Sequence, residues 1–92
     1  MYSSNWEQAL ENFIREFLTC YRRYHQEQYR VPMLTLYTAV EKRMGNTSAA
    51  RFNKAVGDLK RAGLLGTAKS GEFVYLSDAA WGLHVAKMAV QS

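Results

Sequence analysis

Seven basic side chains lie between positions 42 and 69, and they are the residues of this chain best suited to binding a ligand. They are Lys42, Arg43, Arg51, Lys54, Lys60, Arg61 and Lys69. Asp58 is the only acidic residue in the same segment, which therefore carries a charge of +6, whereas the other residues together carry −2. Lys and Arg neutralise phosphate groups, and Arg can bond guanine through two parallel hydrogen bonds. The segment is suited to binding a polyanion such as nucleic acid.

The patterns of common catalytic and cofactor sites are not found in this sequence. His25 and His84 are far apart, and neither has a His, Cys or acidic residue at a recognised metal-ligand spacing. The segment GTAKSG lacks the glycine spacing of a nucleotide-binding loop, and no Ser-His-Asp or Cys-His arrangement can be defended. We therefore expect no enzyme activity, no metal site and no cofactor.

Length and composition predict one folded domain over residues 1–92. Hydrophobic residues make up 48% of the chain, enough for a core, and the formal charge of +4 favours an anionic partner. Cys20 is the sole cysteine, and its apolar neighbours predict a buried thiol in a reducing compartment. Neither a signal peptide nor a stretch of the ~18 apolar residues that cross a membrane is found. We expect a cytoplasmic protein that does not enter membranes.

Residues 1–28 are predicted to form one long helix. Neither Gly nor Pro occurs from Ser3 to Glu27, and apolar residues recur at alternating spacings of four and three. This stripe consists of Trp6, Leu10, Phe13, Phe17, Cys20 and Tyr24, and it is widened on one side by Ile14, Leu18 and Tyr21. A helix of about 23 residues spans roughly 35 Å, which exceeds what one face of so small a domain needs.

The surplus apolar surface of this long helix predicts a homodimer. The candidate interface residues are Trp6, Leu10, Phe13, Phe17 and Tyr24, together with Trp81 of the last helix. Val85 and Met88 can share the same interface. The alternative is a monomer whose long helix folds over its own core.

Residues 31–90 are predicted to hold an extended segment, two helices joined by a tight turn, a hairpin and a last helix. Val31 before Pro32 favours an edge strand or an extended connector. A helix is expected from Leu34 to Met44, with Thr35 as its N-cap and Gly45 as its end.

The second helix of this pair is bracketed by Gly45 and Gly63. Asn46, Thr47 or Ser48 can cap it. The helical period predicts an inward set of Ala49, Phe52, Val56 and Leu59, and an outward set of Thr47, Ala50, Arg51, Lys54, Asp58 and Arg61. The outward face is mostly small or basic.

The chain is predicted to end in a β-hairpin and a helix. Strands are expected over 64–68 and 72–77, with Phe73 and Tyr75 alternating against Val74 and Leu76 around a Lys69-Ser70-Gly71 turn. Ser77 or Asp78 caps the last helix, which is expected to run to Val90 with Trp81, Val85 and Met88 or Ala89 inward.

This succession resembles a winged-helix domain, over roughly Val31 to Val90. The resemblance rests on the segments LTLYTAVEKRMG, TSAARFNKAVGDLKRAGLL, GTAKSGEFVYLS and SDAAWGLHVAK. The tail YLSDAAWGLHVAK is similar to the segment after the wing in MarR-like and PadR-like bacterial regulators. The glycine of that segment is present as Gly82, but its acidic pair is reduced to Asp78. The resemblance implies a mainly α fold of the α+β class: a winged helix-turn-helix with a long N-terminal helix, a β-hairpin wing and a C-terminal helix.

Such a fold implies sequence-selective binding of double-stranded DNA by a homodimeric transcriptional regulator. The N-terminal residues of the second helix of the motif approach base edges, which selects Thr47, Ser48, Ala50, Arg51 and Lys54. Phosphate or minor-groove contacts are expected from Arg61, Lys42, Arg43, Thr67, Lys69 and Ser70. Replication or partition of a mobile element is another use of the same contacts. The main alternative is a module that binds a protein partner in a larger assembly, and Asp58 on the outward face favours it.

Overall fold

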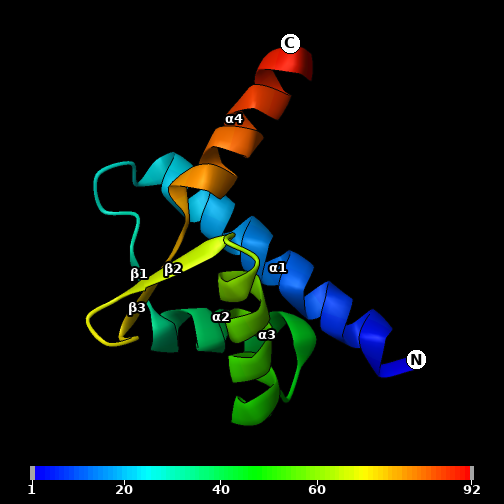
Figure 1. Cartoon of the computed structure of the whole chain (residues 1–92). Helices are drawn as coiled ribbons and strands as arrows, with labels where there is room; N and C mark the ends of the chain where they lie inside the picture. The colour runs from blue at the N-terminus through cyan, green and yellow to red at the C-terminus, as the bar shows by residue number, and fades with distance from the viewer. Residues whose placement is uncertain (1, 92) are drawn as a thin grey trace.

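A long helix runs along one side of the molecule, and two further helices and a small sheet pack against it (Figure 1). The computed structural model describes residues 2–91. In chain order the elements are α1 (Tyr2–Tyr24), β1 (Val31–Pro32), α2 (Met33–Met44), α3 (Ala49–Arg61), β2 (Leu65–Ala68), β3 (Phe73–Leu76) and α4 (Asp78–Gln91). The protein is therefore mainly helical and belongs to the α+β class, as predicted. No helix within residues 2–91 is both long enough and apolar enough to cross a membrane.

The buried face of α1 is centred on Leu10, Ile14 and Leu18, which are at most 1% exposed. These residues form one row at a spacing of four, and α2, α3 and β3 all contact α1. The predicted stripe shares Leu10 with this row, and its Trp6, Phe13 and Phe17 are half-buried against the core. Its last two residues were wrongly placed, because Cys20 is exposed rather than buried and Tyr24 is 76% exposed.

A tight turn sets α3 against α2. Gly45 ends α2 at a φ of 85°, a conformation that favours glycine, and its N–H donates to the Glu41 carbonyl. Ser48 then caps α3, because its Oγ accepts a hydrogen bond from the N–H of Arg51 at 3.2 Å. The predicted glycine stop and one of the three predicted caps are confirmed.

Pro32 makes α2 begin earlier than predicted. The proline has a φ of −56° and precedes the first helical residue, Met33, and no side chain caps the helix. The N–H of Met33 instead donates to the Glu72 carbonyl at 2.9 Å. Thr35 lies inside the helix rather than at its start, so the predicted cap was wrong.

The three strands form an antiparallel sheet in the order β1-β3-β2. Leu65 pairs with Leu76, and Ala68 with Phe73, which confirms the hairpin. Val31 pairs with Val74 on the other side of β3, and neither side chain is exposed. The segment around Val31 is therefore an edge strand, and its pairing ties the chain between α1 and α2 to the hairpin.

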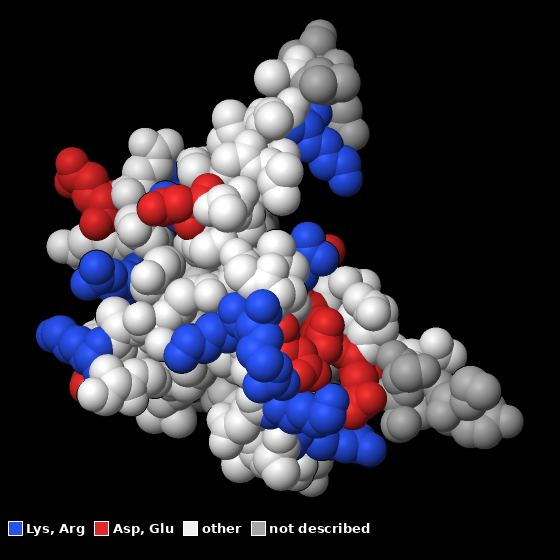
Figure 2. All heavy atoms as spheres, viewed as in Figure 1, with Lys and Arg blue, Asp and Glu red and all other residues white. Residues whose placement is uncertain are grey.

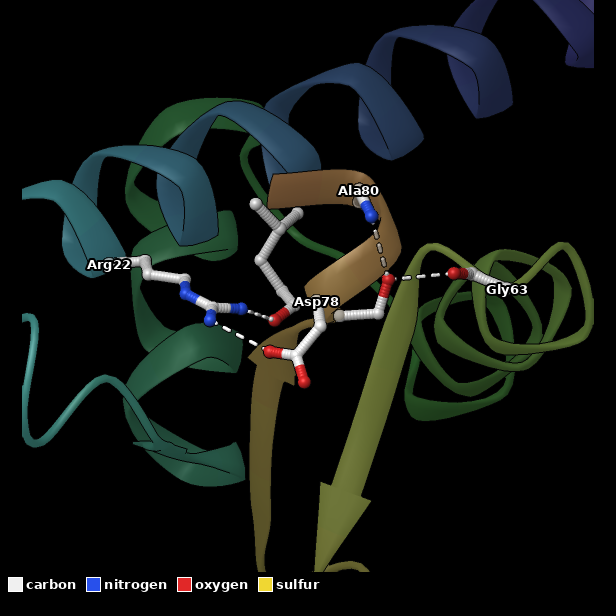
Figure 3. A network of polar contacts seen from close by, with 6 residues as sticks. Arg22, Gly63, Asp78 and Ala80 are labelled. Carbon is white, nitrogen blue, oxygen red and sulfur yellow. Dashed lines mark hydrogen bonds and ion pairs between the residues drawn. The ribbon is translucent and has the colours of Figure 1, made fainter. Parts of the chain in front are cut away.

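The Ser77 side chain joins the turn after α3 to the start of α4, through the two dashed bonds that lead to the labelled Gly63 and Ala80 in Figure 3. Its Oγ donates to the carbonyl of Gly63 at 2.7 Å and accepts a hydrogen bond from the N–H of Ala80 at 3.1 Å. The second contact is an N-cap, as the sequence predicted. One hydroxyl thus satisfies a backbone group at each of two helix ends.

Arg22 anchors α4 to α1, as Figure 3 also shows. Its Nη1 donates to the Leu76 carbonyl and its Nη2 pairs with Asp78, both at 2.8 Å. The guanidinium carbon lies 4.2 Å from the ring centre of Tyr29 and 5.5 Å from that of Trp81. Only 13% of the Arg22 side chain is exposed. The end of α1, the following connector, β3 and α4 therefore meet at one largely buried cation.

Candidate nucleic-acid interface

The buried face of α3 consists of Phe52, Ala55, Val56 and Leu59. Three of these were predicted, whereas Ala55 was missed and Ala49 was wrongly placed inward, since it is exposed. Because successive residues turn by about 100°, this set directs the opposite side of α3 outward. The exposed or half-exposed residues there are Ala50, Asn53, Lys54, Gly57, Asp58, Lys60 and Arg61.

Two groups on this outward side were missed by the sequence analysis. Asn53 is exposed one turn after Ala50, and Gly57 follows one turn later. A Cβ added at Gly57 would lie 3.6 Å from the Arg61 guanidinium, so the end of the Arg61 side chain lies beside the helix surface at this point. Both residues would have been found if the inward face had been centred on Ala55 rather than drawn toward Ala49.

Thr47 does not belong to the outward surface. It is 4% exposed, its hydroxyl donates to the Gly45 carbonyl at 3.0 Å, and its own carbonyl accepts a hydrogen bond from the Tyr37 hydroxyl. The prediction of a groove contact at Thr47 was wrong, because the turn uses its polar groups to hold α2 and α3 together. Ser48, the adjacent candidate, is exposed but has its hydroxyl in the helix cap.

Arg51 lies on the edge of α3 that borders α1. Its guanidinium carbon is 4.8 Å from the centre of a Trp6 ring, within the range of a cation–π contact, while the residue remains exposed. This contact directs the side chain toward the first turns of α1. Arg51 is therefore less well placed for the outward side than the sequence indicated.

Lys54, Asp58 and Arg61 form a chain of two ion pairs on the surface of α3. The Lys54 Nζ lies 3.0 Å from Asp58 Oδ2, and the Arg61 Nη2 contacts Asp58 Oδ1. Each oxygen of one carboxylate thus holds a different cation. The spacings of four and three residues are those at which side chains meet on a helix.

These contacts shift two pKa values in opposite directions. The hydrogen bond from Lys54 lowers the pKa of the Asp58 carboxyl, and the same bond raises the pKa of the Lys54 amine. When the pH is above the ordinary pKa of a carboxyl group, the pairing stabilises the folded protein. This stabilisation is lost as the pH falls through the lowered pKa of Asp58. It is lost again when the pH rises through the raised Lys54 value, so both pairs are intact near neutral pH.

Acidic residues of α1 border the basic side of α3. Glu7 and Glu11 line the same shallow depression as Arg51, Lys54 and Asp58, and both raise the pKa of Lys54 through space. Figure 2 shows the result as blue basic surface over α3 with red acidic surface directly beside it. The cluster of positive charge predicted from the sequence is thus bounded by negative charge on its α1 side.

The remaining predicted contacts lie on other elements. Lys42 and Arg43 are exposed in the last turn of α2, and Thr67 is half-buried in β2. Lys69 and Ser70 are exposed at the hairpin tip, with positive φ values of 52° and 57° although neither is glycine. The Lys69 Nζ lies 5.4 Å from the ring centre of Phe73.

The predicted dimer residues divide between core and surface. Leu10 is completely buried within its own chain and is unavailable to a second copy in this conformation. The side chains of Trp6, Phe13, Phe17 and Trp81 are half-buried against the same core, and only Tyr24 is well exposed. On α4, by contrast, Leu83 and Val85 are 68% and 45% exposed. The most exposed apolar helix is α4 rather than α1.

Within residues 2–91, no group of three or more His, Cys, Asp or Glu side chains is arranged to hold a metal ion. No protein-family model, curated protein or solved structure matches this chain.

Proposed function

We propose that this protein is a winged helix-turn-helix domain that binds double-stranded DNA in a sequence-selective way. The observation that carries the proposal is the outward side of α3, where small residues and an amide are flanked by cations. The element order supports it as well, since two helices joined by a tight turn are followed at once by a hairpin. In this proposal α3 lies in the major groove, and the β2–β3 hairpin is the wing.

Asn53 is the residue of α3 best suited to reading a base. Its amide is exposed between Ala50, which has only a methyl group, and Gly57, which has no side chain, so the helix backbone can approach the groove floor. An Asn amide can form two hydrogen bonds to the edge of adenine, and one such pair discriminates by about 1–3 kcal/mol. This assignment replaces Arg51, which is turned toward Trp6.

Phosphate contacts are supplied by cations on three elements. Lys60 on α3, Lys42 at the end of α2 and Lys69 at the wing tip are all exposed. The positive φ values at Lys69 and Ser70 cost of order 1 kcal/mol each, and conformations of this kind are concentrated at functional sites. The backbone strain supports a role for the wing tip in contacting DNA.

Selection of bound sequences from a random duplex library tests the proposal. We expect the wild-type protein to enrich one motif, and the Asn53→Ala variant to lose the preference for adenine at one position of it. Other positions of the motif should be unaffected, since base contacts at separate positions act nearly independently.

Each outcome of the selection separates the competing functions. Enrichment without any change in the Asn53→Ala variant would remove Asn53 from the base contacts but keep DNA binding. A wild-type protein that binds no duplex would contradict the proposal and favour a protein-interaction module. Cytoplasmic transcription regulation and partition of a mobile element use the same contacts, and the genomic position of the selected motif would distinguish them.

The same proposal includes a homodimer, with α4 as its main contact. Asp78 and Lys87 are the only charged residues among its 14, and Leu83 and Val85 are exposed on different sides of the helix. Figure 1 shows its C-terminal half extending beyond the other elements. A helix that is apolar on several sides is normally covered. An open groove between α1 and α4, lined by Leu64 and Leu83 with Glu16 and Lys87, provides the receiving surface for a second copy.

We expect Leu83→Asp to convert the dimer to a monomer of 10.5 kDa in sedimentation at micromolar concentration. A carboxylate at this position would be buried without a partner in the dimer, but it remains in water in the monomer. Tyr24→Ser is the matched control, because Tyr24 is exposed at the end of α1, where the sequence placed the interface. A monomeric wild type, or dissociation by Tyr24→Ser alone, would contradict the α4 contact.

A further inference from the structure

Asp58 is the one acidic residue of α3, and it pairs with two cations on the side of the helix that the proposed function places in the groove. Its two oxygens hold Lys54 and Arg61 separately, and its side chain is 32% exposed. The two cations are far more exposed, at 63% and 73%. Asp58 therefore cancels positive charge on the part of α3 that would face a duplex.

The carboxylate weakens the general attraction of α3 for DNA. Non-specific binding depends almost entirely on cations that neutralise phosphates, whereas a specific complex also has base contacts. A phosphate that binds Lys54 or Arg61 either takes the cation from Asp58 or comes close to the Asp58 carboxylate, and in both cases the carboxylate opposes the negatively charged backbone. This cost weakens binding to every duplex. It removes a larger share of the binding free energy where phosphate contacts are the only contacts.

In a specific complex the position of α3 in the groove is fixed, which limits the number of phosphates that Lys54 and Arg61 can reach. Base contacts by Asn53 hold α3 at one position in the groove, so Lys54 and Arg61 reach only the phosphates that this position offers. On other sequences the protein can shift along the groove until released cations find phosphates. The pairing of Lys54 and Arg61 with Asp58 thus weakens complexes with other sequences more than it weakens the complex with the selected sequence.

We propose that Asp58 is a selectivity determinant, which lowers affinity for DNA in general by holding Lys54 and Arg61. The inference rests on the proposed function and adds to it a residue that opposes binding. Glu7 and Glu11 act on Lys54 only through space, since the ion pairs of Lys54 and Arg61 are both to Asp58. Asp58 is therefore the residue whose removal releases both cations.

The test compares wild type with Asp58→Asn, which keeps the shape of the side chain and removes its charge. Affinity is measured by fluorescence anisotropy for the selected duplex and for a scrambled duplex, over a range of salt concentrations. For the scrambled duplex we expect about tenfold tighter binding, with a salt slope steeper by up to about 2, because two cations become available to phosphates. For the selected duplex we expect less than about a threefold gain, so the selectivity ratio falls.

Glu11→Gln is the matched control, since it removes one carboxylate beside α3 that does not hold Arg61. It should change the affinity for the scrambled duplex by less than about twofold, because exposed charges that are not in contact are screened by salt. Thermal melting of both variants shows whether the fold is kept.

The outcomes distinguish the inference from the proposed function. If wild type binds its selected duplex and Asp58→Asn leaves the selectivity ratio unchanged, the inference is wrong and the function stands. Equal effects of Asp58→Asn and Glu11→Gln would also overturn it, since general charge rather than the ion pairs would then be responsible. If neither protein binds any duplex, the proposed function fails and the inference fails with it.

Discussion

Ala50→Glu should weaken binding to the selected duplex by about a hundredfold or more, which corresponds to about 2.7 kcal/mol. Ala50 is exposed in the first turn of α3, on the side proposed to enter the groove. A carboxylate there would lose its water and face base edges and phosphates without a cation of its own. The same charge near the positive end of the helix dipole favours the folded helix, so the loss of binding should not come from unfolding.

Ala50→Gln is the control for this variant, because glutamine has nearly the same size as glutamate but no charge. Anisotropy with the selected duplex should show a much smaller loss for Gln than for Glu, and circular dichroism should show unchanged helix content for both. Equal losses would mean that size rather than charge excludes DNA. Near-wild-type affinity of Ala50→Glu would remove the first turn of α3 from the interface.

Arg22→Ala should lower the free energy of unfolding by about 2–3 kcal/mol, as expected when a largely buried side chain loses a hydrogen bond to a carbonyl and two ring contacts. The substitution leaves the Leu76 carbonyl without the donor that Arg22 supplies and removes a cation from between the rings of Tyr29 and Trp81. It also detaches the first turn of α4 from α1. Urea unfolding followed by tryptophan fluorescence measures the effect.

Asp78→Asn separates the ion pair from the rest of this network. The Asp78 side chain is 87% exposed, so its pair with Arg22 is screened by water, and its loss should cost less than about 1 kcal/mol. The difference between the two variants then reports the carbonyl and ring contacts of Arg22. Equal costs would show that the ion pair, rather than the buried contacts, anchors α4.

The sequence predicted those parts of the fold that local chemistry decides. Gly45 and Gly63 bracket α3 because each adopts a positive φ, and Ser48 caps it with its own hydroxyl. Local chemistry does not decide which row of α1 side chains is buried. The rows through Leu10 and Ile14 and through Phe13 and Phe17 both satisfy the helical period, and only contact with α2, α3 and β3 decides between them.

In the candidate site, contacts within one helix could be predicted from the sequence, whereas contacts between helices could not. Spacings of four and three residues around Asp58 indicate its pairs with Lys54 and Arg61, so this chain of contacts was open to sequence analysis. The contact of Arg51 with Trp6 joins residues far apart in the chain, and no local pattern indicates it. Thr47 was misplaced for a related reason, because the Tyr37 hydroxyl that binds its carbonyl comes from the preceding helix.

The Ser77 hydroxyl, which is hydrogen-bonded to both Gly63 and Ala80, helps to fix the angle between α3 and α4. Rotating α4 relative to α3 must break its bond to the Gly63 carbonyl or its bond to the Ala80 N–H. If two copies are joined through α4, the angle held at Ser77 sets how far apart their two α3 helices lie. The number of base pairs between two half-sites would then depend on side chains such as Ser77 and Arg22, which hold α4 in place.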